Sequence, residues 1–322
     1  VKDIPGATNA RKLIVETGLR YLDNLSGNAA GDAALRRELA AAYRRIGDVQ
    51  GNVLGSHLGN TKEATASYRK SLALLAPLTA GAQPDREALV EQLLLLQRLG
   101  SVYSYTKDLA QAEATYREAA AFAEQQYGRS PEDEAIGRQL ANVLAELSDV
   151  RRRMGDFPGA LPESEKALGL LRKFLAAHPE DEELRHSVAV GYASVGLCEV
   201  RMGRLRPALE KYRESAAMLE ELVRRNPSKL QRQRDLMFTY SHTGDVLGHP
   251  NLTNLGDAAG AAEAYRRMAD TAKKLHEADP ADERAKSDYG IALMRAATVL
   301  PDGKGEEKIE MFRKSLQLAE EG

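Results

Sequence analysis

The residues of this chain that could do chemistry are few and lie apart in the sequence. His242, Asp245 and His249 follow one another at i, i+3 and i+7, a spacing that could place three metal ligands on one helix face. Gly244 and Gly248 interrupt that face, which favours a helix end in contact with solvent over a metal site. The sequence contains no HExxH zinc motif, no GxSxG nucleophile motif and no glycine loop of the phosphate-binding pattern. We therefore expect no catalytic residue, no metal and no cofactor, and we predict that this chain is not an enzyme.

Composition and charge narrow the class of protein further. The 322 residues carry 45 Lys and Arg against 47 Asp and Glu, a formal net charge of −2. General binders of nucleic acid or of anionic membranes normally have a strong basic excess, so we expect neither kind of partner. The single cysteine, Cys198, excludes an internal disulfide and a thiol-based zinc site, and we expect it in the core. No apolar stretch approaches the ~18–20 residues that span a bilayer, so we expect no direct membrane insertion by this segment.

Five prolines divide the chain at nearly equal intervals and indicate the elements that must position any site. They lie 47, 48, 48 and 53 residues apart: Pro84, Pro131, Pro179, Pro227 and Pro280. A long internal period is typical of a stacked-repeat solenoid rather than of a single globular core. The interval 180–226 reads as two amphipathic helices, here called helix A and helix B, with Gly203 between them. We expect the other intervals to form the same kind of pair.

Small and aromatic residues recur at fixed places in these helix pairs. Helix A carries a small residue at one equivalent position: Gly47, Gly100, Ser148, Gly196, Gly244 and Ala296. Helix B carries an alanine, replaced by Lys308 in the last pair: Ala64, Ala112, Ala160, Ala208 and Ala261. An aromatic residue follows four residues later, replaced once by Ser164: Tyr68, Tyr116, Tyr212, Tyr265 and Phe312. Small side chains let two helices approach to the ~8 Å lower limit of helix packing, and we expect the aromatic residues to fill the core.

This combination resembles the tetratricopeptide repeat (TPR). The stretch GLCEVRMG has a helix-A glycine and a second glycine seven residues later, and ALEKYRES supplies the alanine and the aromatic residue. The usual repeat has about 34 residues, whereas this one has 48, an excess of about seven residues per helix. The resemblance implies an all-α fold, an α-α superhelix (TPR-like solenoid) of about six extended helix pairs plus an N-terminal capping helix, forming one solenoid over 1–322. The expected bounds are 8–25 for the capping helix and 32–80, 85–128, 132–178, 180–226, 228–279 and 281–321 for the pairs.

Two loops depart from the pattern in the same way. The second glycine position lies seven residues after the first in four pairs, but twelve after it in 47–59 and 244–256. The two stretches, GDVQGNVLGSHLG and GDVLGHPNLTNLG, agree at six of thirteen positions. One interpretation is a pair of binding loops at the edge of a groove. The other, which we favour, is a duplicated structural turn in which Asp48 and Asp245 hold local backbone amides.

The resemblance implies a non-catalytic protein-interaction scaffold that binds a protein or peptide in a concave groove lined by helix A. The family's helix-A register gives the candidate groove residues: Arg44, Asp48, Gln97, Ser101, Tyr105, Asn142, Asp149, Arg152, Arg201 and Asp245. The densest basic run, 151–153, could form a basic strip with Arg201, although we favour positive side chains in solvent near a helix C-terminus. The groove known in this family for the terminal carboxylate of chaperone tails is not expected, because Asp48 and Glu146 would repel a carboxylate.

A second resemblance concerns the context of the chain. The opening KDIPGATNARKLIVETGLRYLDNL, together with RELAAAYRRIGDVQGN, is similar to the TPR-bearing C-terminal region of large bacterial serine/threonine protein kinases. The chain itself has no kinase motif, and because it begins at Val1 we read it as a segment of a longer protein. The resemblance implies an alternative role as the sensory or regulatory region of a kinase anchored in a bacterial inner membrane; the sequence alone leaves the localisation open. A third alternative is a self-assembly module that forms a homo-oligomer through its end repeats.

Overall fold

The structure is a computed structural model that describes residues 8–27, 29, 31–51, 58–80 and 83–320. Over these residues the regular elements are thirteen α-helices and one short 3-10 turn, without a strand, so the predicted all-α fold is confirmed. The chain divides into two compact units, residues 1–156 and 157–322. The expected pair 132–178 contributes its helix A to the first unit and its helix B to the second. One continuous solenoid over 1–322 stays a prediction.

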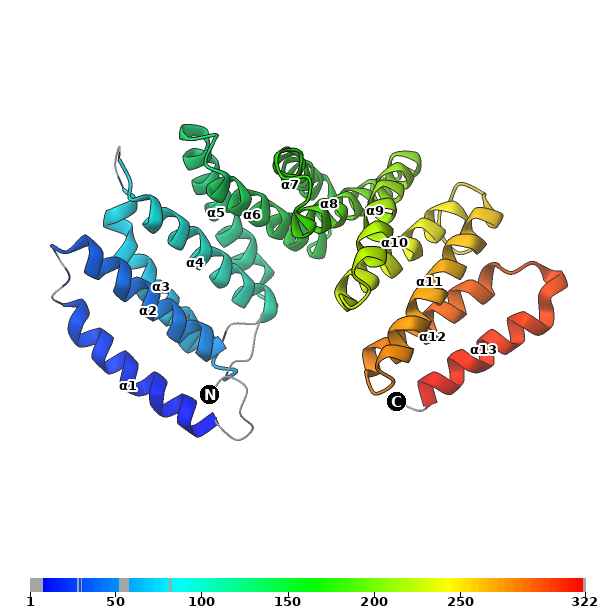
Figure 1. The fold of residues 1–322 in the computed structure, drawn as a ribbon, viewed down its shortest axis with the longest axis horizontal. Helices are drawn as coiled ribbons and strands as arrows, with labels where there is room; N and C mark the ends of the chain where they lie inside the picture. Colours follow the sequence, from blue (N-terminus) through cyan, green and yellow to red (C-terminus); the bar gives the residue numbers. More distant parts are fainter. Residues whose placement is uncertain (1–7, 28, 30, 52–57, 81–82, 321–322) are drawn as a thin grey trace. The chain divides into compact units, whose positions relative to one another are not determined.

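Within each unit, every helix packs against the next one in the chain (Figure 1). The first unit contains α1 (Thr8–Ser26), α2 (Ala33–Gly51), α3 (Thr61–Thr79), α4 (Arg86–Tyr105), α5 (Leu109–Arg129) and α6 (Glu134–Arg153). The second unit contains α7 (Phe157–Ala177), α8 (Glu182–Arg201), α9 (Leu205–Arg225), α10 (Leu230–Gly248), α11 (Ala258–Ala278), α12 (Glu283–Val299) and α13 (Gly305–Glu320). These bounds agree with the predicted helix pairs to within a few residues. Even-numbered helices from α2 to α12 are helices A, and odd-numbered helices from α3 to α13 are helices B.

The prolines that set the period lie in the turns between helix B of one pair and helix A of the next. After Pro84, Asp85 caps α4 by accepting a hydrogen bond from the N–H of Ala88 (3.0 Å). Asp181 and Asp282 cap α8 and α12 in the same way. An N-cap carboxylate accepts a hydrogen bond from a backbone amide that has no partner within the helix. The regular spacing of these prolines and aspartates therefore sets where each of these helices begins.

The small residue of helix A contacts the aromatic residue of helix B in four pairs, where the predicted core role of the aromatic residue is confirmed. A Cβ atom on Gly47, Gly100 or Gly244 would lie 2.6 Å from the ring of the facing tyrosine, and one on Gly196 would lie 2.9 Å from it. The four tyrosines are fully buried: Tyr68, Tyr116, Tyr212 and Tyr265. Only glycine lets a ring lie this close to a helix backbone. In the last pair Phe312 is 40% exposed, so its predicted core role is wrong.

The small position of the last pair is Ala297, and the prediction of Ala296 is wrong by one residue. Ala297 follows the N-cap residue Asp282 by fifteen residues, as Gly100 follows the N-cap residue Asp85. Both alanines are buried, and the pair lacks the glycine and tyrosine that mark the register elsewhere. The register of α12 matters because it determines which of its side chains are equivalent to those of α10 and α8.

The first helix does more than cover the end of the array. Tyr43 of α2 donates its hydroxyl hydrogen bond to Asp23 Oδ1 of α1 (2.5 Å), and Tyr240 of α10 donates to Glu220 Oε1 of α9 (2.8 Å). Each acid precedes its tyrosine by 20 residues. Because α9 is the helix B that precedes α10, α1 takes the place of a helix B in front of α2. The predicted capping helix is therefore present, and it packs as half of a preceding pair.

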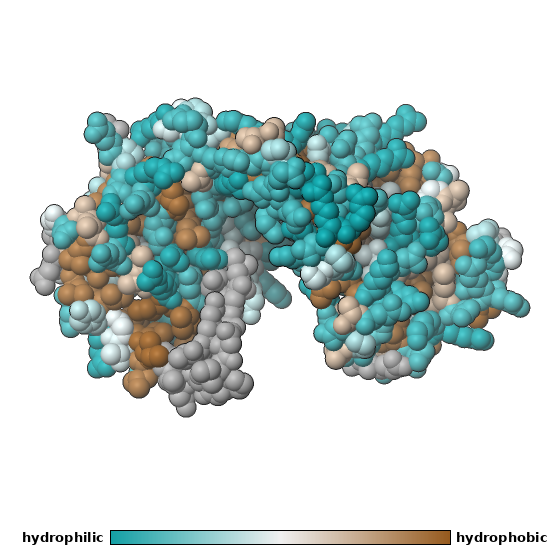
Figure 2. All heavy atoms as spheres, viewed as in Figure 1, coloured by the Kyte–Doolittle hydropathy of each residue, from teal (hydrophilic) through white to brown (hydrophobic). Residues whose placement is uncertain are grey.

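The surface visible in Figure 2 is mostly hydrophilic, and apolar side chains show between the helices of each unit. The predicted core position of Cys198 is confirmed, since its side chain is fully buried. None of the helices in the described part of the chain is both long and apolar enough to cross a membrane.

Candidate functional site

The helices A share the face on which the predicted groove residues lie. Positions six and three residues before the small residue, and one, four and five after it, fall on one side of the helix. We call this side the A face, and all ten predicted groove residues occupy these positions. Successive helices A touch one another, α2 with α4, α4 with α6, and α8 with α10. Their A faces therefore lie side by side within each unit.

In the first unit, two predicted groove residues form an ion-pair network that joins α2 to α4. Arg44 Nε donates to Glu91 Oε1 of α4 (2.5 Å), and Arg44 Nη1 lies 3.1 Å from Asp48 Oδ2. Arg98 Nε, also on α4, lies 3.6 Å from Asp48 Oδ1, which accepts a hydrogen bond from Tyr68 OH (2.9 Å). The structure thus brings Arg44 and Asp48 together with their charges balanced inside the protein. They position neighbouring helices A rather than offering free charges to a ligand.

The second unit repeats this network at Asp245. Tyr265 OH donates to Asp245 Oδ1 (2.6 Å), Arg295 of α12 donates to the same oxygen, and His242 Nδ1 lies 3.9 Å from Oδ2. Burial alone would raise the pKa of Asp245, but the hydrogen bonds from His242 and Tyr265 and the charge of Arg295 lower it. Burial and the Asp245 carboxylate raise the pKa of Tyr265, which remains a neutral donor. In both units the acid precedes its tyrosine by 20 residues and its arginine by 50.

The histidines near Asp245 pack against tyrosine rings. His242 stacks on Tyr212 with ring centroids 5.5 Å apart, and His249 packs edge-on against Tyr265 at 6.2 Å. No three His, Cys, Asp or Glu side chains gather closely enough to hold a metal ion in the part of the chain that the structure describes.

The two inserted loops close in the same way where they meet the helices. Leu58 N–H donates to the carbonyl of Val49 (3.0 Å), and Leu255 N–H donates to that of Val246 (2.9 Å). The last glycine of each loop has φ of +79°, a left-handed conformation that favours glycine. Residues 52–57 of the first loop lie outside the described residues. The predicted duplication is therefore a shared way of closing the helix pair.

An asparagine organises the second loop. Asn254 Nδ2 donates to the carbonyls of His249 (2.9 Å) and Leu252 (2.8 Å), and its Oδ1 accepts the N–H of the following glycine (2.8 Å). The interpretation in which Asp48 and Asp245 hold local backbone amides is wrong, because both carboxylates bind tyrosine and arginine side chains. A binding role for the loops stays a prediction.

Three predicted residues on α4 and α6, Ser101, Asp149 and Arg152, also have partners within the protein. Ser101 shares a hydrogen bond with Tyr116 OH (3.0 Å), in the place that an aspartate takes in the two networks above. Arg152 Nη2 donates to Asp149 Oδ1 (2.7 Å), one turn apart on α6. These contacts reduce the charge that this part of the A face presents.

The other predicted groove residues are more open. Tyr105 is 60% exposed, Asn142 is exposed, and Gln97 is half-buried. Arg201 is exposed, with its guanidinium 5.5 Å from the centroid of the Phe157 ring. Binding by any of these residues stays a prediction.

The A face of the second unit carries an apolar strip that the sequence prediction missed. Val190, Phe238 and Ile291 are 38%, 38% and 43% exposed, and each lies six residues before the small residue of its helix. Met294, three residues after Ile291, is 46% exposed. Among the predicted groove residues, only Asn142 lies six residues before the small residue of its helix. Because the last small residue was placed one position too early, Ile291 was not recognised as a residue of this register. The sequence signal that could have identified the strip is an apolar residue at the same register of α8, α10 and α12.

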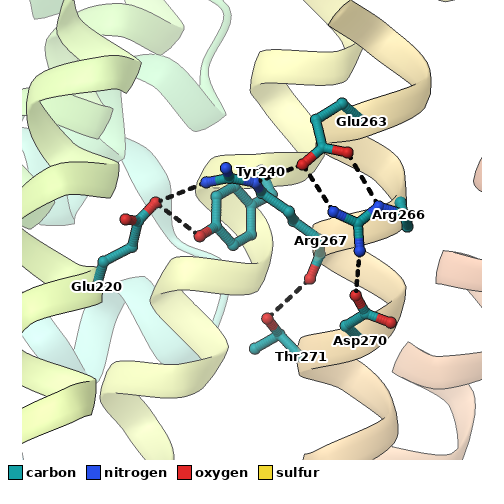
Figure 3. Close-up of polar contacts among 7 residues, drawn as sticks. All are labelled: Glu220, Tyr240, Glu263, Arg266, Arg267, Asp270 and Thr271. Carbon is teal, nitrogen blue, oxygen red and sulfur yellow. Dashed lines mark hydrogen bonds and ion pairs between the residues drawn. The ribbon is translucent and has the colours of Figure 1, made fainter.

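A second surface lies between the helices B of the second unit. Tyr240 OH of α10 donates to Glu220 Oε1 of α9, and Arg267 Nη1 of α11 donates to the same oxygen (3.2 Å; Figure 3). The Arg267 guanidinium also lies over the Tyr240 ring, 5.8 Å from its centroid. Burial and the Glu220 carboxylate raise the pKa of Tyr240. These three side chains bridge α9 to α11 across α10.

The bridge separates two hollows of one cleft, here called the B-side cleft. One hollow, of about 250 Å³, is bordered by four small residues together with larger and charged side chains. The other, of about 620 Å³, is bordered by polar, charged and apolar side chains. Glu263 Oε1 accepts hydrogen bonds from Arg266 Nη2 and Arg267 Nε (both 2.8 Å), and these arginines lower the pKa of Glu263 to about 2. Arg266 Nη1 also donates to Asp270 (2.9 Å; Figure 3). The arginines that reach the bridge are thus fully engaged with acids.

The fold is that of a helical-repeat protein, and comparison with known proteins indicates which kind of repeat it contains. Residues 94–126, which contain the turn between α4 and α5, match the family model of the tetratricopeptide repeat. No curated protein sequence matches the chain significantly. Residues 94–126 therefore match a tetratricopeptide repeat, as the sequence resemblance predicts, and the other helix pairs of the described residues have the same helix–turn–helix arrangement with long helices.

Solved structures share this fold at low sequence identity. BtubC from P. vanneervenii is 15% identical with a TM-score of 0.56, and the match covers 84% of this chain and 93% of that one. The S. pombe nuclear import adaptor Nro1 is 12% identical with a TM-score of 0.57, covering 90% and 94%. Apo RapI is 13% identical with a TM-score of 0.51, covering 87% and 97%. At such identities the likeness concerns the fold alone.

Proposed function

We propose that this chain is a non-catalytic protein-interaction scaffold that binds a peptide or partner protein along the A face. The apolar strip of the second unit is the observation that carries the proposal. Val190, Phe238 and Ile291 leave about two-fifths of their side chains in water, at one register of three successive helices A. Covering each ~100 Å² of apolar surface contributes about 2.5 kcal/mol, so a partner gains most by placing apolar side chains on this strip. A few such anchors supply most of the affinity of a typical interface.

The A face of the first unit has smaller or less exposed residues at this register, beside charged side chains. The same register there holds Ala41, Leu94 and Asn142, and the neighbouring charges Arg44 and Asp48 are held by each other and by α4. Polar groups fixed in advance select among partners rather than add affinity. In this proposal the apolar strip of the second unit supplies affinity, while the predicted groove residues of the first unit outside the Arg44–Asp48 network supply selectivity.

The test uses short random peptides displayed on phage and selected on the intact chain. Peptides that bind the A face should bind a Phe238→Ser variant about tenfold to a hundredfold more weakly, because losing a buried phenylalanine contact costs about 1.5–3 kcal/mol. Fluorescence anisotropy measures the dissociation constants. Leu316→Ser, which changes an exposed apolar residue on α13 away from the A face, is the matched control and should bind unchanged. Arg152→Glu tests the first unit and should alter which peptides are selected while leaving the melting temperature within a few degrees.

Failure of the proposal has a clear signature. Either no peptide is enriched above an unrelated helical protein, or the enriched peptides bind wild type, Phe238→Ser and Arg152→Glu equally well.

Self-assembly is a second candidate because apolar residues are exposed at both chain ends. They are Leu13, Ile14 and Tyr21 on α1 and Ile309, Phe312 and Leu316 on α13. The helix order argues against a simple continuation of the array, since α1 and α13 both take the place of a helix B. Sedimentation at several concentrations separates this role from peptide binding. The regulatory role beside a kinase stays a prediction, and reading the sequence that precedes Val1 in the parent protein is its test.

A further inference from the structure

The B-side cleft has an apolar hollow formed by small residues. Ala216 and Ala217 of α9 face Gly260 and Ala264 of α11 across it, with the ring of Tyr240 alongside. Helices normally fill such a gap with larger side chains that interdigitate. Here the small residues leave a hollow of about 250 Å³ that is open to the surface and suited to an aliphatic side chain.

Three basic side chains around the cleft have no acidic partner among the residues that the structure describes. The three acids that border the cleft, Glu220, Glu263 and Asp270, are all bound by Arg266 or Arg267. Arg213, Arg224 and Lys274 also border it: Arg213 on the apolar hollow, Arg224 and Lys274 on the larger one. Among the described residues no carboxylate pairs with any of these three. The cleft therefore presents an apolar pocket beside an excess of positive charge.

The first unit contains a counterpart of the bridge. Asp23 accepts hydrogen bonds from Tyr43 OH and Lys70 Nζ (both 2.5 Å), and Lys70 lies over the Tyr43 ring at 5.4 Å. Each of these three residues precedes its partner in the B-side cleft by 197 residues: Asp23 before Glu220, Tyr43 before Tyr240, and Lys70 before Arg267. The two bridges are thus built in the same way from helices in the same order.

At the same offset, the counterpart has other residues at the positions that border the hollow and carry the bases. Leu19 stands in place of Ala216, and Glu63 in place of Gly260. Glu16, Gly27 and Pro77 stand in place of the three unmatched bases. The small residues and the three bases are consequently not required by the bridge, because the same bridge forms in the first unit with other residues at those positions.

We propose that the B-side cleft binds an acidic peptide segment that carries one aliphatic side chain. The aliphatic side chain enters the hollow between Ala216 and Ala264, and carboxylates on either side of it pair with Arg213 at one end and with Arg224 and Lys274 at the other. Arginine and lysine on both walls of a cleft raise the local concentration of an acidic partner and orient it. This site is separate from the A face and stands independently of the function proposed there.

The experiment selects short random phage-displayed peptides on the intact chain and compares variants that import residues from the counterpart. Arg213→Glu introduces the charge of Glu16, and Ala216→Leu introduces the side chain of Leu19; both residues are already accommodated by the same bridge in the first unit. Arg206→Glu is the matched control, because it makes the same charge change on α9 outside the cleft. Melting temperatures within a few degrees of wild type establish that each variant folds.

The expected result is enrichment of peptides with an aliphatic residue flanked by Asp or Glu on wild type and on Arg206→Glu. Their dissociation constants should rise at least tenfold for Arg213→Glu and for Ala216→Leu, and stay unchanged for Phe238→Ser on the A face. The proposal is overturned if no acidic-aliphatic peptides are enriched, or if they bind Arg213→Glu and Ala216→Leu as well as wild type. Acidic-aliphatic peptides that lose affinity only for Phe238→Ser would also overturn it, since they would belong to the A face.

Discussion

Replacing Gly244 with alanine should destabilise this protein, although alanine is the better helix former. An added Cβ would lie 2.6, 2.7 and 2.8 Å from Cε1, Cζ and Cδ1 of Tyr265. Carbon atoms in contact normally lie ~3.5–4.0 Å apart, so the ring would have to move by about 1 Å. It has little freedom to do so, because it is fully buried and its hydroxyl is bound to Asp245.

The magnitude follows from three contributions to the free energy of unfolding. Glycine to alanine within a helix gains about 1 kcal/mol. Overpacking a closed core costs about 1–3 kcal/mol, and moving the hydroxyl away from Asp245 gives up a hydrogen bond to a charged group, about 1.5–3 kcal/mol. We therefore expect Gly244→Ala to lower the free energy of unfolding by about 2–5 kcal/mol.

Urea unfolding followed by helical circular dichroism measures this change, and the chain supplies a matched control. Gly169 lies within α7 with no atom within 4 Å of its added Cβ, so Gly169→Ala should raise the free energy of unfolding by about 1 kcal/mol. Combining Gly244→Ala with Tyr265→Leu should cost less than the sum of the two single changes, because the smaller side chain makes room for the methyl group. Equal stability of Gly244→Ala and wild type, or full additivity in the double variant, would refute the steric reasoning.

Two further predictions concern the helix turn after α4 and the response to acid. Lys107 has φ of 64°, whereas the equivalent positions of the next two pairs are Gly155 and Gly203, with φ of 83° and 76°. Because a left-handed backbone is unfavourable for a residue with a Cβ atom, Lys107→Gly should raise the free energy of unfolding by about 1 kcal/mol. Lys107→Ala keeps the Cβ and should change little; both are measured by urea unfolding, and equal effects would contradict the role of the left-handed backbone. The folded pKa of Asp245 lies below its ordinary value of 3.8, so its contribution to stability is complete above that pH and is lost as the pH falls through the folded pKa. Asp245→Asn should therefore flatten the acid-side fall in stability, and curves that run parallel to wild type would disprove the assignment.

Much of the fold can be predicted from the sequence because most helix pairs carry residues that mark where their helices begin and end. Proline and an N-cap aspartate precede α4, α6, α8 and α12, and in four pairs the glycine of helix A meets the tyrosine of helix B, so local chemistry and packing agree. Registration fails where those markers are missing: α12 has Ala297 in place of glycine, and Phe312 of α13 is partly exposed. That one-residue error is enough to conceal Ile291 as part of the apolar strip.

The side-chain networks could not be predicted from local patterns. Asp48 looked like a turn residue because an aspartate before a loop commonly binds backbone amides. Its actual partners lie 20 and 50 residues further along the chain, on two other helices, and only the packed structure brings them to it. The B-side cleft was missed for a related reason, since a hollow depends on the sizes of side chains that face each other from separate helices.

Comparison of the two units separates residues that build the scaffold from residues that can give it specificity. At an offset of 197 residues, the Asp-Tyr-Arg networks and the acid-tyrosine-base bridges recur with the same partners, so these side chains are accounted for by helix packing. Where the two units have different residues at equivalent positions, helix packing does not determine the residue type. Phe238 is equivalent to Ala41, Arg213 to Glu16 and Ala216 to Leu19. Binding should therefore respond to changes at the differing positions and stability to changes at the shared ones. A variant at a shared position that altered peptide selection without lowering stability would contradict this division.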